Sequence, residues 1–375
     1  AGFGTNSQAA PHSYLSAADV MNVSEITLRR LNLPLKIPYK LAFGPVTAFD
    51  TILVTVTGDD GEEGFGEATI LTGYTPETVD GAWAKARELA ALLKGMAAEA
   101  AKVEALKHHK AAPFTVTSLV TAIEMAEGSP FLEITRETPV PLLAILSASD
   151  EPGIAREMEQ HRAARYGTVK VKVGFEWESD AKRLKFIQDQ VTAMGPGAPG
   201  LRIDGNQGYS LDDALAFTRI LAPDHIELFE QPCHMDDWDA AKAVSEISPV
   251  PMMLDESIYG PAEIERAAET GSARFVKLKL MKAGSLGNLA AQLERIRELG
   301  MEPVLGNGVA RGLLYRSNAP LRDRVSHLRN GNGDGGVIGR ASRPDAEASE
   351  PVGGRVRRPL RLAWAVRCVC VRPRV

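Results

Sequence analysis

A regular alternation of short apolar runs with amphipathic segments is the feature of the sequence that most restricts its fold. Seven apolar runs follow Pro139, at residues 140–146, 168–174, 200–204, 226–232, 250–256, 275–280 and 302–308. Strand–helix units repeated at this spacing predict parallel strands joined by right-handed crossovers. Seven units in succession favour an α/β fold with a (β/α)8-type, TIM-like barrel. An open doubly wound sheet is the alternative, but no G-x-G-x-x-G motif follows the first run, so dinucleotide binding has no support.

The first part of the chain has a different pattern. Residues 24–35 and 50–58 resemble strands with a long connection between them, and a third short strand ends near Glu67. From Thr75 the pattern is helical, with Thr75 and Pro76 in the N-cap and first-turn positions. We therefore expect an N-terminal α+β capping domain over residues 22–135 and a barrel domain over residues 136–310.

The two ends of the chain depart from this order. Residues 311–375 contain 14 arginines, no lysine and five acids, a net charge of +9, whereas residues 1–310 carry 29 basic and 43 acidic residues, a net charge of −14. The tail shows no helix or strand period, so we interpret it as aberrant or disordered, and the closing strand of the barrel is in doubt. A basic arm for an anionic partner is one interpretation. We favour a segment foreign to the domain, such as a shifted reading frame produces. Residues 1–21 are small and polar, and we expect a mobile extension there.

Composition excludes several classes of protein. Hydrophobic residues make up 44% and charged residues 24% of the chain, which is typical of a globular protein. No apolar run approaches about 18 residues, so no membrane-spanning helix is expected. Three cysteines exclude a disulfide scaffold and predict a cytoplasmic location. A net charge of −5 gives no general support for a nucleic-acid partner.

Charged residues stand at the ends of five successive predicted barrel strands. Lys172 lies near the end of the second strand, and Lys279 near the end of the sixth. The third, fourth and fifth strands end in Asp204, Glu230 and Asp255. The C-terminal ends of barrel strands meet at one mouth, where three carboxylates repel unless a cation lies among them. One such acid is more simply a solvated strand end, but three of them, each one unit apart, predict a site for Mg²⁺, with Mn²⁺ as a substitute.

The lysines indicate the chemistry. A lysine within an apolar strand is costly unless it faces the mouth or the surface, and the surface interpretation suits Lys277 or Lys282. Lys172 and Lys279 come from strands on either side of the acids, so they would approach a bound substrate from opposite faces. Nearby positive charge lowers the pKa of a lysine, as a general base requires. A metal stabilises the enediolate that forms when the proton next to a carboxylate is removed.

At these residues the sequence resembles the enolase superfamily, in particular the muconate lactonizing enzyme subgroup of the mandelate racemase/muconate lactonizing enzyme family. The matching motifs are KVKVG, IDGNQ, LFEQP, MLDES and KLKLMK, in order and spacing, within residues 22 to about 308. The resemblance implies that Asp204, Glu230 and Asp255 are Mg²⁺ ligands. It also implies that Lys172 and Lys279 are the acid/base pair.

The same resemblance assigns further residues. Lys170 is implied to be an accessory cation near the substrate carboxylate, and Asn206 to lie beside the metal. A lysine on the sixth strand separates this subgroup from mandelate racemase-like members, which use a histidine–aspartate base. Two capping-domain loops, at residues 37–49 and 71–76, are implied to cover the mouth. Candidate substrate contacts on them are Phe43, Phe49 and Tyr74, although these aromatics could equally pack the cap against the barrel.

We therefore expect a Mg²⁺-dependent isomerase, foremost a racemase or epimerase of an N-acyl amino acid or dipeptide, because one of two opposed lysines can remove the α-proton and the other can return one. A cycloisomerase of the muconate lactonizing type, or a syn-dehydratase of the o-succinylbenzoate synthase type, needs only one lysine for proton transfer and stays open. So does a catalytically inactive, metal-binding relic. The expected partner is a small carboxylate-containing substrate, without nucleic acid or membrane, and a homo-oligomer is left open.

Overall fold

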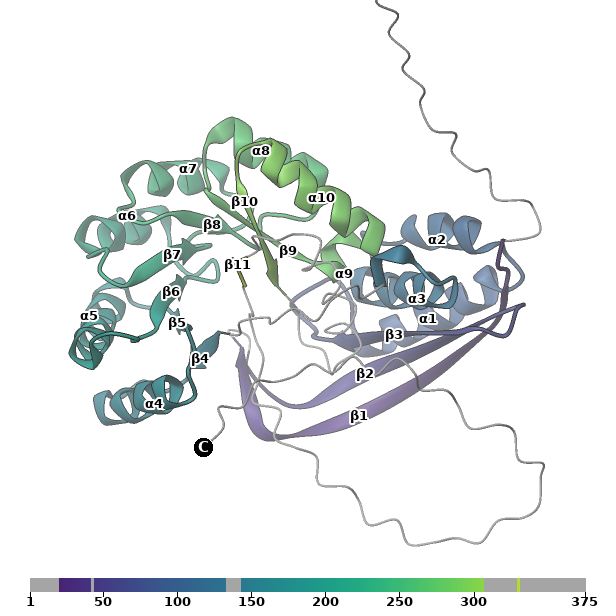
Figure 1. Ribbon diagram of the computed structural model, residues 1–375, viewed down its shortest axis with the longest axis horizontal. Coiled ribbons are helices and arrows are strands. Elements are labelled where there is room, and N and C mark those ends of the chain that lie inside the picture. Colours follow the sequence, from purple (N-terminus) through teal and green to yellow (C-terminus); the bar gives the residue numbers. More distant parts are fainter. Residues whose placement is uncertain (1–19, 42–43, 133–142, 307–328, 331–375) are drawn as a thin grey trace, which may run out of the picture.

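The computed structural model describes residues 20–41, 44–132, 143–306 and 329–330, and only the backbone of residues 36–41, 44, 45, 329 and 330. Figure 1 shows two parts that lie against each other: an antiparallel sheet with helices on one side, and a curved parallel sheet with helices on its outer side. These are the α+β cap and the barrel-type α/β part that the sequence predicts.

The cap contains one antiparallel sheet in the order β1-β2-β3. Its strands are β1 (Val23–Leu41), β2 (Gly44–Gly58) and β3 (Glu63–Ile70). Its helices are α1 (Val79–Leu93), α2 (Ala98–Leu106), α3 (Pro113–Ala126) and the short 3-10 helix η1 (Pro130–Leu132). The predicted long connection between the first two strands is wrong, because β1 and β2 stay paired as far as Leu41 and Gly44. A register shift between Pro34 and Tyr39 interrupts the ladder and hides its alternation in the sequence.

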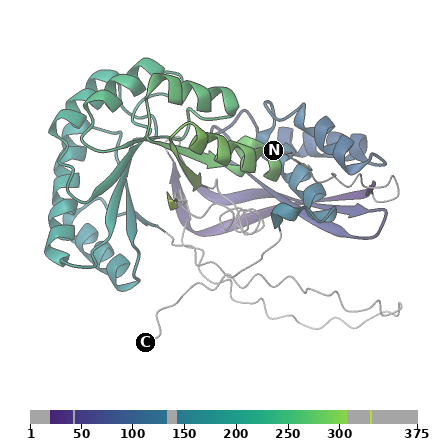
Figure 2. The ribbon, with the colours of Figure 1, turned by 45° about the horizontal axis from the view of Figure 1, so that its top comes forward.

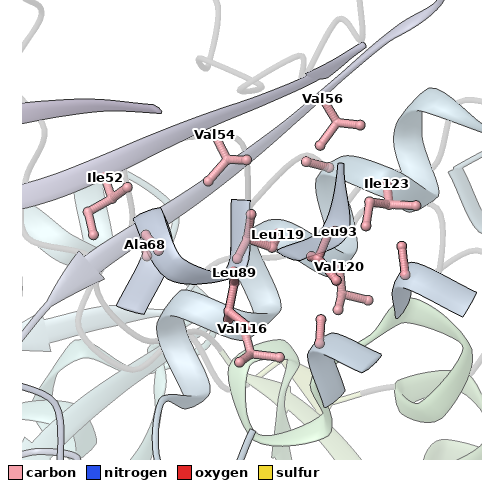
Figure 3. Close-up of a cluster of buried hydrophobic side chains, with 14 of the residues drawn as sticks. Ile52, Val54, Val56, Ala68, Leu89, Leu93, Val116, Leu119, Val120 and Ile123 are labelled. Carbon is pink, nitrogen blue, oxygen red and sulfur yellow. The ribbon is translucent and has the colours of Figure 1, made fainter. Parts of the chain in front are cut away.

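The core of the cap lies between the sheet and its helices. Ile52, Val54 and Val56 alternate along β2, so all three point to one face, where α1 and α3 cover them (Figure 3). Gly66 on β3 lets α3 come close, since a Cβ there would lie 1.8 Å from the carbonyl oxygen of Ser118. Helix α1 begins at Val79 after the N-cap Thr78, so the predicted start at Thr75 and Pro76 is wrong by one helical turn. Met21, assigned to the N-terminal extension from the sequence, is buried in this core.

The parallel sheet runs in chain order from β4 to β10, with β11 beside β10. Its strands are β4 (Ala144–Leu146), β5 (Thr168–Lys172), β6 (Gly200–Asp204), β7 (Ile226–Glu230), β8 (Met252–Leu254), β9 (Phe275–Lys279), β10 (Glu302–Gly306) and β11 (Arg329–Asn330). Strands β4 to β10 lie in the seven predicted apolar runs, which confirms the barrel-type fold class. Strand β11 was not predicted, because two residues are too few to show a pattern. Within the described ranges, β4 and β11 are the edges of the sheet, and no pairing closes it.

Helices follow the strands and cover the convex face of this sheet, as Figure 2 shows from a second direction. They are α4 (Glu151–Ala163), α5 (Trp177–Met194), α6 (Leu211–Ile220), α7 (Trp238–Ile247), α8 (Pro261–Thr270) and α10 (Leu286–Glu298). The short helix α9 (Leu280–Ala283) instead follows the end of β9 and lies beside α3 of the cap (Figure 1). Helix α6 begins after the N-cap Ser210, whose hydroxyl accepts a hydrogen bond from the backbone N–H of Asp213 at 3.2 Å. Because the strands are parallel, their C-terminal ends lie together along one edge of the sheet, which we call the C-terminal rim.

Hydrogen bonds connect the cap to the segment that follows β9. The Glu124 carboxylate of α3 accepts hydrogen bonds from the backbone N–H of Leu286, 3.0 Å from each oxygen, at the start of α10. The Thr117 hydroxyl donates to the Met281 carbonyl at 3.3 Å, and His109 Nε2 lies 2.8 Å from the same oxygen. These contacts hold α3 directly behind the end of β9 and so position the cap over that strand end.

The buried carboxyl group of Glu124 is expected to make the stability of the chain depend on pH. Burial raises the pKa of its carboxyl to about 7, against the opposing effect of the N–H groups of Leu286 and Gly287. A folded pKa above the ordinary value means that the folded chain binds more protons than the unfolded chain in this window, so the free energy of unfolding falls as pH rises towards 7. Glu124→Gln keeps a hydrogen-bond acceptor but cannot ionise. We expect it to reduce the loss of stability between about pH 5 and pH 8 by about 1–3 kcal/mol, measured by urea unfolding. Glu63→Gln, at an exposed position, is the control, and equal pH slopes for Glu124→Gln and wild type would contradict the prediction.

Candidate active site

The five predicted site residues lie side by side along the C-terminal rim of the parallel sheet. Lys172, Asp204 and Glu230 are the last residues of β5, β6 and β7, and they are register partners from strand to strand. Asp255 directly follows β8, and Lys279 is the last residue of β9. Since each strand ends at the same level, the sheet brings all five side chains to one place.

Buried ammonium groups lie between the three carboxylates. Lys170 Nζ is 2.5 Å from Asp204 Oδ2 and 2.9 Å from Glu230 Oε2. Lys277 Nζ is 2.7 Å from Glu230 Oε1 and 3.1 Å from Asp255 Oδ2. Both lysines are only 1% exposed. Each neighbouring pair of carboxylates therefore shares one buried cation.

The two lysines of the predicted acid/base pair lie nearer the rim. Lys172 Nζ is 2.8 Å from Asp204 Oδ2 and also donates to the side-chain oxygen of Asn206. Lys279 Nζ is 2.9 Å from Asp255 Oδ2. The lysine side chains differ in access, with 29% of Lys172 and 3% of Lys279 exposed. Strands β5 and β9 lie on opposite sides of β6, β7 and β8, so the two ammonium groups come from opposite flanks of the carboxylates.

The expectation that Lys277 or Lys282 faces the surface is wrong for both. Lys277 shares the inward face of β9 with Lys279, two residues away, and the carboxylates offset the cost of its burial. Lys282 lies on α9, and its Nζ is 3.0 Å from Asp255 Oδ1 and 2.6 Å from the Asp255 carbonyl oxygen. The sequence signal for the position of Lys277 was the K-x-K motif, which occurs as KVK in β5 and again as KLK in β9. In each strand the two lysines are two residues apart and therefore point to the same face of the sheet.

These cations control the charge of the two aspartates. Burial alone raises the pKa of Asp204, but the ammonium groups of Lys170 and Lys172 outweigh it and hold the pKa well below its usual value. Burial acts on Asp255 in the same way, and Lys277 foremost among its lysine neighbours lowers the pKa far below the usual value. Both aspartates are therefore carboxylates at neutral pH.

Two polar residues that sequence reasoning missed support the rim. Gln231, next to Glu230, accepts hydrogen bonds through Oε1 from the backbone N–H of Asp255 at 3.0 Å and of Ser257 at 3.2 Å, so it ties the end of β7 to the turn after β8. Glu256 accepts a hydrogen bond from the Asn206 side chain at 3.1 Å. Burial raises the pKa of Glu256 to about 7. Both lie in quoted motifs, LFEQP and MLDES, but no spacing rule distinguished them from their neighbours.

The three candidate substrate contacts have different outcomes. Tyr74 lies in the turn after β3, where its hydroxyl accepts a hydrogen bond from Lys279 Nζ at 2.6 Å and its ring packs 6.3 Å from that of Phe114. Phe49 lies within β2, paired with Leu33, and not in a loop. Phe43 lies outside the described residues. The cap therefore reaches the rim through Tyr74.

The donor chemistry of the rim fits a hard divalent cation, because three carboxylates from adjacent strand ends are the ligands that Mg²⁺ prefers. As the side chains lie, however, no three acidic, histidine or cysteine groups in the described part of the chain are arranged around one metal position. Ammonium groups occupy the spaces between the carboxylates. Asp204, Glu230 and Asp255 are thus suitable ligands for which a metal has to compete with lysines.

Other features of the described chain lie apart from this rim. A hollow of about 870 Å³ opens at the opposite, N-terminal ends of β7 to β10, where Glu227, Arg274 and Glu302 line it. Barrel enzymes carry their chemistry at the C-terminal face, so this hollow is not the candidate active site. None of the described helices has the length and apolar character needed to cross a bilayer.

Comparison with known proteins agrees with this architecture of a capped barrel. Residues 23–127 match the family model "Mandelate racemase / muconate lactonizing enzyme, N-terminal domain", and residues 153–321 match "Enolase C-terminal domain-like". The L-Ala-D/L-Glu epimerase of Bacillus subtilis (strain 168) is 28% identical over 307 residues, which cover 76% of this chain and 81% of the epimerase. The aromatic dipeptide epimerase of Herpetosiphon aurantiacus is 30% identical over 279 residues, which cover 70% and 76% of the two chains.

Solved structures give the same result. The substrate-liganded complex of the L-Ala-D/L-Glu epimerase from Bacillus subtilis has a TM-score of 0.71 and 26% sequence identity, and the match covers 80% of this chain and 86% of that one. The fold and the rim define a barrel enzyme with a capping domain. The chain belongs to the mandelate racemase/muconate lactonizing enzyme family of the enolase superfamily. It is an enzyme of the isomerase class.

Proposed function

We propose that the chain is a Mg²⁺-dependent epimerase that removes the proton next to the carboxylate of a small substrate, an N-acyl amino acid or a dipeptide. The observation that carries the proposal is the position of Lys172 and Lys279, at the ends of β5 and β9, on either side of the three strands that bear the carboxylates. Two bases on opposite flanks suit inversion, in which one removes the α-proton and the other delivers a proton to the opposite face.

Each residue of the rim receives a role in this proposal. Asp204, Glu230 and Asp255 would hold Mg²⁺, or Mn²⁺ in its place. A bound metal supplies positive charge that stabilises the negative charge developing on the substrate carboxylate. Lys172 and Lys279 transfer the protons at the α-carbon.

Neighbouring polar groups support the two bases. Lys170 adds positive charge near the substrate carboxylate, and Asn206 orients the Lys172 ammonium, which donates to its side-chain oxygen. Tyr74 does the same for Lys279, through the hydrogen bond of 2.6 Å. Because Tyr74 belongs to the cap, the cap takes part in aligning one of the two bases.

The substrate class is supported by the names of the two relatives described above, an L-Ala-D/L-Glu epimerase and an aromatic dipeptide epimerase. In a dipeptide or an N-acyl amino acid, the reacting carbon lies between a carboxylate and an amide nitrogen, so one small molecule offers both a metal ligand and a hydrogen-bonding group. A cytoplasmic location, inferred from the cysteine content, and a homo-oligomer remain predictions.

Deuterium incorporation tests the proposal. We expect the chain, incubated with Mg²⁺ and a panel of dipeptides and N-acyl amino acids in D₂O, to replace the α-proton of at least one substrate with deuterium and to form its epimer. Mass spectrometry and chiral chromatography measure the two events, and an EDTA-treated sample is the control. Product formation without α-exchange indicates lactonisation or elimination and contradicts epimerisation. Absence of exchange across the panel, with the chain folded, contradicts the proposed activity.

A further inference from the structure

The Lys277 ammonium lies between two of the three carboxylates and has no role in the proposed proton transfer. It is 2.7 Å from Glu230 Oε1 and 3.1 Å from Asp255 Oδ2, in a side chain that is 1% exposed. Lys277 precedes Lys279 by two residues on β9, so it enters the same face of the strand one layer deeper in the sheet. It therefore approaches the carboxylates from within the barrel, away from the side open to substrate.

Pairing of buried charge does not by itself explain this lysine. Without Lys277, Asp255 still has Lys279 at 2.9 Å and Lys282 at 3.0 Å. Glu230 still has Lys170 at 2.9 Å. Each carboxylate thus has another ammonium partner. Lys277 adds one more positive charge between Glu230 and Asp255, and a divalent cation would need the same two carboxylates as ligands.

We propose that Lys277 is a built-in competitor of the metal: its ammonium holds Glu230 and Asp255 together before a divalent cation binds, and it weakens their affinity for that cation. This inference rests on the proposed function, because it takes the three carboxylates as the metal site. The ammonium and the metal share two ligands, and like charges within a desolvated site repel strongly. The wild-type site therefore binds metal loosely and exchanges it readily.

Lys277→Met tests the inference, because methionine is similarly long and flexible and carries no charge. The probe is Mn²⁺, and its dissociation constant is measured on the full chain by calorimetry and by the electron paramagnetic resonance of free Mn²⁺. We expect Lys277→Met to bind Mn²⁺ at least about tenfold more tightly than wild type, since a repelling unit charge is removed from the site. Lys242→Met, at an exposed position on α7, makes the same change in net charge and is expected to leave the dissociation constant unchanged.

The outcomes separate the two proposals. If wild type binds Mn²⁺ and Lys277→Met binds it equally or less tightly, the competitor role is overturned and the proposed function stands. If neither chain binds Mn²⁺, both are overturned. If Lys277→Met folds only when Mn²⁺ is added, the metal has replaced the ammonium, as expected. Should Lys277→Met not fold even with Mn²⁺, the comparison is made with Lys277→Gln, and an unchanged dissociation constant there overturns the inference.

Discussion

Replacing either rim lysine with alanine is expected to reduce epimerisation by at least about 10³-fold, because general acid–base groups contribute roughly 10²–10⁴-fold each and inversion needs both. The two variants are expected to differ in a second respect. Lys279→Ala retains Lys172, so it should still exchange the α-proton of the epimer whose proton faces that lysine. Lys172→Ala should exchange only the other epimer. Separate incubation of the two epimers in D₂O measures this.

Both variants are expected to stay folded, since the acids keep other partners. Asp204 retains Lys170 when Lys172 is removed, and Asp255 retains Lys277 and Lys282 when Lys279 is removed. Lys185→Ala, at an exposed position on α5, is the control for loss of a lysine. If both variants exchange the same epimer, or if neither loses activity, the lysines do not act on opposite faces.

Glu230→Gln is expected to have the largest effect on stability among single changes at the rim. Glu230 is the shared partner of two buried cations, Lys170 and Lys277. Loss of its charge leaves both ammonium groups with one carboxylate each, and breaking a buried ion pair on one side costs about 3–5 kcal/mol. We expect urea unfolding to show a loss of this size, and Mn²⁺ binding to weaken at the same time.

Glu302→Gln is the matched control, because Glu302 also lies on a strand of this sheet, β10, and its carboxylate pairs with a cation, Arg274, at 2.7 Å. The side chains of Arg274 and Glu302 are 59% and 37% exposed, so we expect a loss of only about 1 kcal/mol or less. Equal losses for the two variants would contradict the view that the rim depends on a network centred on Glu230.

The repeated strand–helix units and the order of the site residues along the rim could be predicted from the sequence, because both recur once in each strand–helix unit. Each barrel strand is a short apolar run, and a charged residue at its end stands out. Lys277 was harder to place, since a lysine in an apolar strand usually reaches the surface. Only Glu230, at the end of β7, and Asp255, directly after β8, make its burial favourable.

Individual hydrogen bonds between distant segments could not be predicted, although the family resemblance placed the loop that carries Tyr74 at the mouth. The hydrogen bond from Lys279 to Tyr74 joins residues 205 positions apart, and nothing in either local pattern indicates it. The pairing of β1 and β2 beyond Pro34 was missed for a related reason, because a shifted register has no simple alternation. Gln231 escaped notice because its two acceptor contacts depend on where the next strand ends.

A crystal structure of the chain with Mg²⁺ and a bound dipeptide tests the central claim most directly. We predict one Mg²⁺ with oxygen atoms of Asp204, Glu230 and Asp255 at about 2.0–2.1 Å, and the ammonium groups of Lys172 and Lys279 on opposite faces of the α-carbon. A metal bound elsewhere, or both ammonium groups on one face of that carbon, would contradict it.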